Sequence, residues 1–295
     1  MSACDETAPS TKRRSPGLDG ICVSDSDKSS SDILEARSRR QLLQESWYRF
    51  VEAVPEMRQP WCATLVWGGG AFAAAICLWF GWMLARALPY GALLAQSLFV
   101  LWAGLGVYGG FWRHRAAYRE RYAALAYRQL FFRFLAPGLV GGVAAIYFPL
   151  LVGGERLLPP AVAYSLAAYL LATAGLIEVR GKEIFWDIEW RSFVYNVFPE
   201  RGRVVTSGIF HWLRHPVYSA AIRFVFATAL VRNNWSALAC ATMISAALWF
   251  LGSVEARDLT ERDAGYATYR RSVPAFFSVH PLRFWRFLLA GKEAD

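Results

Sequence analysis

Long stretches without any charged side chain dominate this sequence. Five of them cover residues 61–84, 87–112, 134–154, 157–177 and 233–254. A helix needs about 20 residues to cross a bilayer core of about 30 Å, and core helices of soluble proteins are rarely this long and uncharged. A shorter apolar stretch, 216–231, contains the single charge Arg223. The sequence therefore predicts an all-α, multi-pass transmembrane helical bundle of about six spans.

Composition and charge support a membrane protein and argue against other classes. Hydrophobic residues make up 55% of the chain, charged residues 19%, and the mean hydropathy is +0.24, which is too apolar for an ordinary soluble domain. The net charge of +9 on such a chain suits anionic membrane lipids, and without zinc-finger spacing or a basic recognition helix we expect no nucleic-acid partner. The scattered, odd-numbered cysteines predict neither a disulfide framework nor a metal site.

The chain divides into four segments. Residues 1–32 are rich in Ser, Asp, Lys and Pro, which predicts a disordered N-terminal tail. In 33–58, Trp47, Phe50 and Val54 recur on one helical face, which indicates either an amphipathic interfacial helix or a helix packed on the protein's own cytoplasmic side. Residues 61–177 hold four transmembrane helices, and 178–295 hold two more together with most of the polar residues that could act together.

Cations alternate strongly between the two sets of loops. The segment before the first span, the loop after the second and the loop after the fourth carry most of the arginines, whereas the opposite loops hold only Arg86, Arg156 and Arg232. Cytoplasmic loops of membrane proteins are enriched in Lys and Arg. We therefore expect an integral membrane protein with both termini, and the long loop 178–215, in the cytoplasm.

A polar motif precedes the short apolar stretch. Thr206, Ser207 and Gly208 signal a turn, and Pro216 is well placed to begin a helix because its missing N–H needs no partner there. Arg214 and His215 flank that helix start, where free backbone N–H groups and the positive helix end favour an anion. The motif indicates an anion or cofactor site at a membrane surface, or alternatively an interfacial anchor.

A second polar group follows the last span. Glu255 lies where the apolar run ends, so its carboxylate is partly desolvated yet reachable from the cytoplasm, and it could accept hydrogen bonds from a ligand. The alternative is a helix-end salt bridge with Arg257 or Arg214. Tyr266 and Tyr269 follow a short distance later, ahead of a Val-Pro pair at 273–274.

Together the two motifs resemble the isoprenylcysteine carboxyl methyltransferase and phospholipid methyltransferase superfamily. The family pattern is V-T-x-G, then R-H-P-x-Y-x-G, a helical hairpin, E-E, and later Y-x-x-Y-x-x-x-V-P. Residues 205–208, 214–220, 254–255, 266–269 and 273–274 follow this pattern. The departures are Ala220 for the glycine, Val254 for the first glutamate, and Arg262-Asp263 for the usual F-G before the tyrosines.

The resemblance implies that 178–295 form a methyltransferase-like catalytic region that binds S-adenosylmethionine in a cytoplasm-facing pocket. Carried over onto the matching positions, the cofactor-binding residues are Gly208, Arg214, His215, Tyr218 and Glu255. A lipophilic methyl acceptor would then enter from the bilayer. The Rossmann-type glycine-rich loop of soluble methyltransferases has no counterpart here, and the Gly68-Gly69-Gly70 run is expected to be a packing feature.

Arg223 and His211 are the candidate catalytic residues. An arginine inside a span is costly, so Arg223 is expected either to orient a carboxylate acceptor or to snorkel to the cytoplasmic surface. For an amine or thiol acceptor, His211 or His215 could act as the base. The most favoured function is isoprenylcysteine-type O-methylation; the alternatives are phospholipid amine or small thiol methylation, an NADPH-dependent sterol-type reductase, which shares R-H-P-x-Y, and a non-enzymatic scaffold.

Overall fold

The computed structural model describes residues 47–48, 50–201 and 204–291, without the side chains of 182–193 and 201. The chain divides into two units, Met1–Arg39 and Arg40–Asp295, and only the second contains described residues. The predicted tail 1–32 and the predicted helix 33–58 up to residue 46 therefore lie outside them. In the remainder of that helix, Phe50, Val51 and Val54 are buried in the protein core. This end packs on the protein itself.

The described residues are almost entirely helical, and the first half contains three long helical rods. The elements are α3 (Pro60–Ala87), α4 (Gly91–Ala103), the π-helical η2 (Gly104–Trp112), α5 (Arg113–Tyr122), η3 (Ala123–Leu125), α6 (Ala126–Leu130), the π-helical η4 (Phe131–Leu135), α7 (Ala136–Tyr147) and η5 (Phe148–Leu151). A short 3-10 turn, η1 (Pro55–Arg58), precedes them. The chain reverses at Ala123, whose φ is 47°, so that α7 returns along α4.

The second half adds three further rods and several short helices. The elements are α8 (Pro160–Val197), η6 (Pro199–Arg201), α9 (Ile209–Trp212), α10 (Pro216–Arg232), α11 (Trp235–Arg262), α12 (Ala264–Ser272) and α13 (Pro281–Ala290). Proline stands in the first turn of α3, α8, α10 and α13. Its fixed φ suits a helix start and its missing N–H leaves no donor unpaired there, so these prolines explain the helix boundaries.

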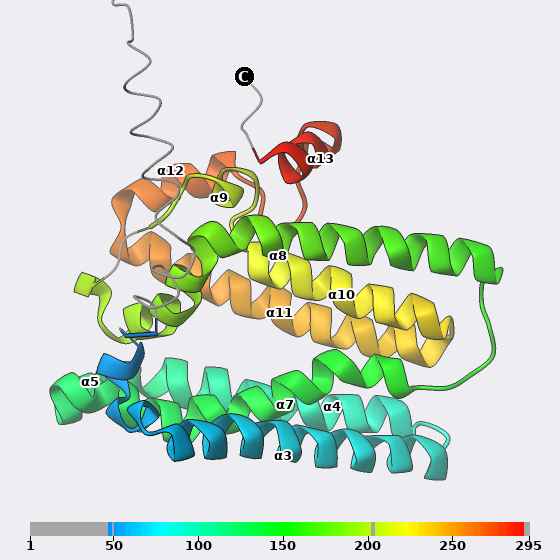
Figure 1. Cartoon of the computed structure of the whole chain (residues 1–295), viewed down its shortest axis with the longest axis horizontal. Helices are drawn as coiled ribbons and strands as arrows, with labels where there is room; N and C mark the ends of the chain where they lie inside the picture. The colour runs from blue at the N-terminus through cyan, green and yellow to red at the C-terminus, as the bar shows by residue number, and fades with distance from the viewer. Residues whose placement is uncertain (1–46, 49, 202–203, 292–295) are drawn as a thin grey trace, which may run out of the picture. The chain divides into compact units, whose positions relative to one another are not determined.

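The rods form two groups within this unit. Helices α3, α4 and α7 pack together, α10 packs between α8 and α11, and contacts of α11 with α4 and α7 join the groups (Figure 1). Gln96 strengthens this junction: it is fully buried on α4, and its side-chain amide donates to the carbonyls of Ala145 on α7 and Cys240 on α11, at 3.0 and 3.1 Å. A buried amide that bridges three helices fixes their register, because displacement leaves its donors unpaired.

Close helix contacts use glycines other than the three expected. Nothing among the described residues lies within 4 Å of a Cβ built on Gly68, Gly69 or Gly70, so that run does not pack against the described part of the chain, contrary to the expectation. A Cβ on Gly106 would instead stand 2.5 Å from the Cα of Gly138. These two glycines allow η2 and α7 to touch backbone to backbone, as small residues do between membrane helices.

Four helical segments of the described chain are long and apolar enough to cross a membrane: Pro60–Ala87, Gly91–Leu151, Pro160–Gly181 and Trp235–Arg262. These helices are those of an integral membrane protein. Gly91–Leu151 has 61 residues and contains two of the predicted spans on its two antiparallel arms. Helix α10 has 17 residues, short of the usual length for a span. Six crossings stay a prediction.

The loops fall at two opposite ends of the bundle. The α3–α4 turn, the segment after η5 and the α10–α11 turn lie at one end, and α5, α9 and α12 lie at the other (Figure 1). The first end is tied together by Arg232, whose Nε donates to the carbonyl of Val152 at 3.0 Å, and by a backbone bond from Leu157 to Asn233. The cation-poor and cation-rich loops are therefore separated as predicted; which end is cytoplasmic stays a prediction.

Candidate functional site

The segment between α8 and α10 turns sharply at Gly208. This residue has φ 59° and ψ −130° and immediately precedes α9. A side chain in this conformation is strained, so glycine is required for the turn. The turn places the carbonyl of Phe210 where it accepts a hydrogen bond from the Tyr269 hydroxyl of α12, at 2.6 Å. Gly208 thus positions α9 beside α12. The role of Gly208 in cofactor binding stays a prediction.

Arg214 and His215 join the start of α10 to the segment that follows α12. Their backbone N–H groups donate to the carbonyls of Pro274 and Ala275 at 2.9 and 3.0 Å, and the Nε of Arg214 donates to the carbonyl of Val273 at 2.8 Å. Three donors from two adjacent residues therefore hold residues 273–275. The two sequence motifs, about 60 residues apart, meet through these bonds.

His215, Tyr218 and Glu255 form a compact group between α10 and α11. The Nδ1 of His215 lies 3.5 Å from a carboxylate oxygen of Glu255, and Tyr218 hydrogen-bonds the same carboxylate. The His215 ring is 6% exposed and stacks between the rings of Tyr218 and Phe276, at centroid distances of 5.7 and 5.5 Å. Glu255 keeps 17% of its side chain accessible. The group therefore combines a partly desolvated carboxylate with stacked aromatic faces.

Arg223 lies on the same side of α10 and is buried, with 8% of its surface exposed. Its Nη1 donates to the carbonyls of Ser219 and Phe276, at 3.0 and 3.2 Å, and to the Ser219 hydroxyl, and its guanidinium covers the Phe277 ring at 4.8 Å. The side chain does not snorkel to the surface. Arg223 thus anchors the backbone carbonyl of Phe276, whose ring stacks on His215.

Ser219 and Phe276 belong to this arrangement, although neither was among the predicted site residues. Ser219 is fully buried, and its hydroxyl donates to the Phe276 carbonyl at 2.5 Å. The spacing of Ser219 and Arg223 by four residues, on one face of α10, was the available signal. Phe276 had no such signal, because its contact with His215 depends on the tertiary fold.

His211 is exposed, unlike His215, Tyr218 and Glu255. It lies on α9 with an exposed side chain, and its ring meets that of Trp212 edge-on at 5.7 Å. The structure therefore brings Arg214, His215, Tyr218 and Glu255 together, with Arg223 behind them, and places His211 on the surface of a short helix.

Two tyrosines of α12 complete the surroundings. Burial raises the pKa of Tyr266, and the neighbouring Arg214 guanidinium opposes this rise only in part. Burial also raises the pKa of Tyr269, chiefly by desolvating its phenolate form. Both hydroxyls are thus protonated at neutral pH. The sequence motif contained these tyrosines, but only the structure places Tyr266 beside Arg214.

The central part of the chain matches a known family. Residues 162–262 match a family model described as phospholipid methyltransferase. The matched residues make up about a third of the chain, and this part is similar to the phospholipid methyltransferase family. The match covers most of α8 and all of α9, α10 and α11, including Arg214, His215, Tyr218 and Glu255, and it ends before α12. The resemblance to the superfamily of membrane methyltransferases is confirmed.

The other two comparisons, with curated proteins and with solved structures, gave no match.

The chemistry of the group suits a cofactor that carries a carboxylate, an ammonium group and an aromatic base. Glu255 offers a carboxylate to an ammonium group or to hydroxyls, and Arg214 offers a cation to a carboxylate. Tyr218, the partly exposed ring of the stack, offers an aromatic face for a purine or a sulfonium, and the buried rings of His215 and Phe276 support it. The donor set therefore fits S-adenosylmethionine.

Proposed function

We propose that this protein is an integral membrane methyltransferase that uses S-adenosylmethionine and methylates a carboxylate on a lipophilic, isoprenylcysteine-type acceptor. The observation that carries the proposal is the meeting of His215 and Tyr218 with Glu255 across the α10–α11 hairpin. The family match over this hairpin supports the methyltransferase part of the proposal.

The protein's own residues bind and orient rather than react. When bound, S-adenosylmethionine supplies a methyl group on a sulfonium, which is a good leaving group. Arg214 would neutralise the cofactor carboxylate, Glu255 would accept hydrogen bonds from its ammonium group or ribose hydroxyls, and the rings around His215 would exclude water. Holding an acceptor in line with the methyl carbon supplies most of the acceleration.

The acceptor class determines whether a base is needed. A carboxylate is already ionised at neutral pH, whereas an amine or thiol must first lose a proton. Of the two candidate bases, His215 is the better placed, because it is buried against Glu255 while His211 is exposed. The description of the matching family favours a phospholipid amine as the second candidate acceptor.

Cofactor binding is the first test. Labelled S-adenosylmethionine should bind the detergent-solubilised protein, and NADPH should not. Glu255→Ala should abolish binding without changing expression or detergent-extracted size. Glu120→Ala is the matched control, because it removes an exposed carboxylate of α5. Normal binding by Glu255→Ala would overturn the assignment of Glu255, and NADPH binding would favour the reductase alternative.

The pH dependence of methyl transfer tests the acceptor class. Carboxyl methylation should show a flat rate between about pH 6.5 and 8.5, because both the acceptor and the sulfonium keep their charge throughout. A rate that rises steadily with pH in this window would contradict a carboxylate acceptor and favour an amine or a thiol.

A further inference from the structure

Gly252 is a buried glycine of α11, three residues before Glu255. A Cβ built on it would stand 3.0 and 3.3 Å from the Cζ and Cε1 atoms of the Phe276 ring, and 3.3 Å from the Cδ2 atom of Tyr218. These distances are shorter than the optimal separation of two carbon atoms, about 3.5–4.0 Å. The missing side chain of Gly252 therefore makes room for the two rings that stack on His215.

Both rings are held in place from their other sides. The backbone carbonyl of Phe276 accepts a hydrogen bond from Arg223 at 3.2 Å, and its buried ring stacks on His215 at a centroid distance of 5.5 Å. Tyr218 stacks on His215 at 5.7 Å, and its hydroxyl donates to the Glu255 carboxylate. A group added at residue 252 would therefore displace rings whose contacts define the candidate site.

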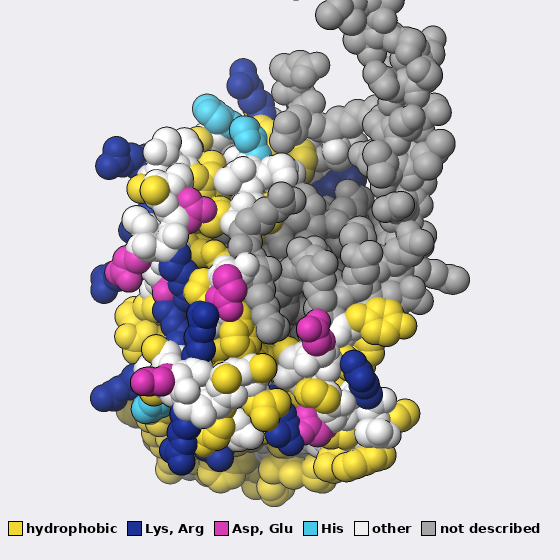
Figure 2. Space-filling model, turned by 90° about the vertical axis from the view of Figure 1, so that its left-hand side faces the viewer, with side chains coloured by type: hydrophobic (Ala, Val, Ile, Leu, Met, Phe, Trp, Pro, Cys, Tyr) yellow, Lys and Arg dark blue, Asp and Glu magenta, His cyan; other side chains and the backbone are white. Residues whose placement is uncertain are grey.

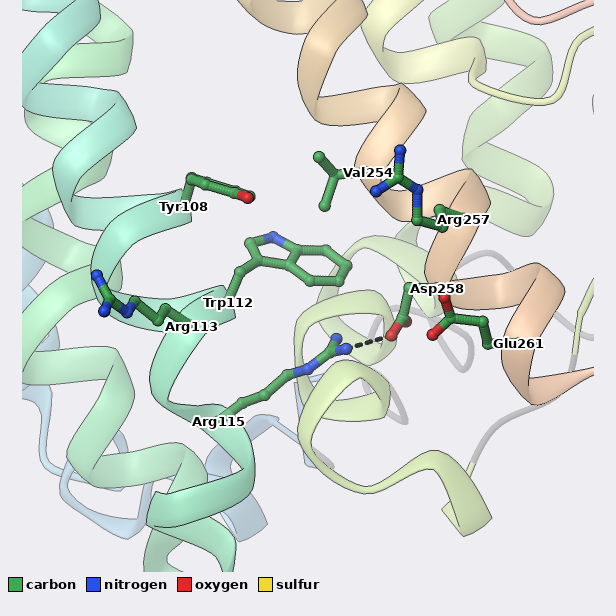
Figure 3. A pocket seen from close by; sticks show the side chains of 8 residues that line it. All are labelled: Tyr108, Trp112, Arg113, Arg115, Val254, Arg257, Asp258 and Glu261. Carbon is green, nitrogen blue, oxygen red and sulfur yellow. Dashed lines mark hydrogen bonds and ion pairs between the residues drawn. The ribbon is translucent and has the colours of Figure 1, made fainter.

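Helix α11 is also held on its opposite side, where a cleft of about 510 Å³ separates it from η2 and α5. The α11 residues that line this cleft are Val254, Arg257, Asp258 and Glu261 (Figure 3). They lie about half a turn around the helix from Gly252. Asp258 is paired with Arg115 of α5 and with Arg262 one turn later on α11. The pair with Arg115 opposes a movement of α11 away from the two rings.

Gly252 stands where the apolar part of α11 ends. Residues 233–254 carry no charge, and Glu255 is the first charged residue after them. The end of the bundle beyond this point, which carries α5 and α12, displays charged side chains of both signs (Figure 2). Gly252 is buried and belongs neither to that charged surface nor to the exposed apolar surface of α11. The physical reason for a glycine here is therefore the packing of the two rings.

We propose that Gly252 is a positioning residue for the cofactor, an inference that rests on the proposed function. It sets where the rings of Tyr218 and Phe276 lie, and through them the orientation of His215 beside Glu255. Glycine is unfavourable in a helix interior relative to alanine, so the close approach of the rings offsets a local loss of helix stability. A methyl group at this position would force the rings to shift by a few tenths of an ångström, and well-packed interiors resist such overpacking.

Binding of labelled S-adenosylmethionine to the detergent-solubilised full chain tests this role. Gly252→Ala should weaken binding by about fivefold or more, because overpacking displaces the rings, with the detergent-extracted size unchanged. Gly175→Ala is the matched control, since nothing among the described residues lies within 4 Å of a Cβ built at that position of α8. The control should bind the cofactor as the unaltered protein does. Normal binding by Gly252→Ala would overturn the positioning role.

Phe276→Leu separates positioning of the rings from general damage to the fold. Leucine lacks the Cζ and Cε1 atoms that a Cβ on residue 252 would meet. In a Phe276→Leu background, Gly252→Ala should therefore change cofactor affinity by less than about twofold, since coupled residues are not additive. This comparison also decides the matter if Gly252→Ala alone is not recovered folded. An equal loss in both backgrounds would overturn the inference while leaving the proposed function intact, whereas absence of binding by the unaltered protein would overturn the proposed function itself.

Discussion

Ser219→Ala should loosen the segment that closes over His215. Ser219 is fully buried, its hydroxyl donates to the Phe276 carbonyl at 2.5 Å, and it accepts a bond from Arg223. The substitution removes both bonds and almost no volume. It leaves Arg223 with the carbonyls of Ser219 and Phe276.

The magnitude follows from the two lost bonds. A neutral hydrogen bond contributes about 1 kcal/mol and one to a charged group about 1.5–3 kcal/mol. Only the bond from the Ser219 hydroxyl to the Phe276 carbonyl holds the segment 273–276 directly. The bond from Arg223 to the Ser219 hydroxyl acts indirectly, because it holds the Arg223 side chain in place. A net loss of about 2 kcal/mol corresponds to a segment that opens about 30-fold more often, since 1.4 kcal/mol is tenfold.

Amide hydrogen exchange measures this opening. The backbone N–H groups of Arg214 and His215 are bonded to the carbonyls of Pro274 and Ala275, so they exchange when the segment detaches. In Ser219→Ala these amides should exchange about 30-fold faster, by the energy derived above. Ser253→Ala is the control, since its hydroxyl bonds only within α11, to the Trp249 carbonyl at 2.9 Å. Unchanged exchange at Arg214 and His215 would refute the anchoring role.

Three further predictions address topology, pH and Arg223. Single cysteines at Arg121 and Glu155, labelled from outside intact cells, should react only at 155; labelling at 121 alone would reverse the predicted orientation. Burial raises the pKa of Tyr269 above its usual 10.0. The protonated Tyr269 hydroxyl therefore contributes fully to the free energy of unfolding below about pH 10, and this contribution is lost as pH rises further. Tyr269→Phe should therefore flatten the fall of Tm between about pH 10 and 11, and an unchanged slope would exclude this source. Arg223→Lys should weaken cofactor binding and methyl transfer together, severalfold each, because a lysine lacks the planar donor set that holds Phe276; loss of transfer with binding intact would instead favour direct orientation of the acceptor.

The helices could be predicted well because their cause is local. Uncharged runs and prolines at helix starts are properties of adjacent residues, and α3, α8, α10 and α11 each cover all or most of one predicted span. The fold-back at Ala123 and the close packing of Gly106 on Gly138 had no comparable signal, because they bring together segments about 30 residues apart. Contacts between residues distant in sequence are not encoded in local periodicity.

The candidate site was predictable only through its motif residues. The R-H-P motif, Glu255 and the Val-Pro pair stand in this sequence in the order and spacing of the family pattern, and that spacing predicted that they meet. The partners that support these residues, Ser219 and Phe276, lie outside the motif. A serine and a phenylalanine are unremarkable in an apolar chain, so only the tertiary fold reveals that one bonds the other's carbonyl.

Arg223 illustrates what an arginine in an apolar helix implies physically. A charge at membrane depth requires a partner, and the sequence suggested a substrate carboxylate or the aqueous surface. The structure supplies a different partner: backbone carbonyls of a segment outside the helices, which also need donors where water is scarce. Arg214 bonds the Val273 carbonyl in the same way from the start of α10. Two arginines thus anchor one irregular segment at both ends, and that segment carries the ring that stacks on His215. The cost of placing these charges is offset by the backbone groups they satisfy, so the site can be preorganised before any ligand binds.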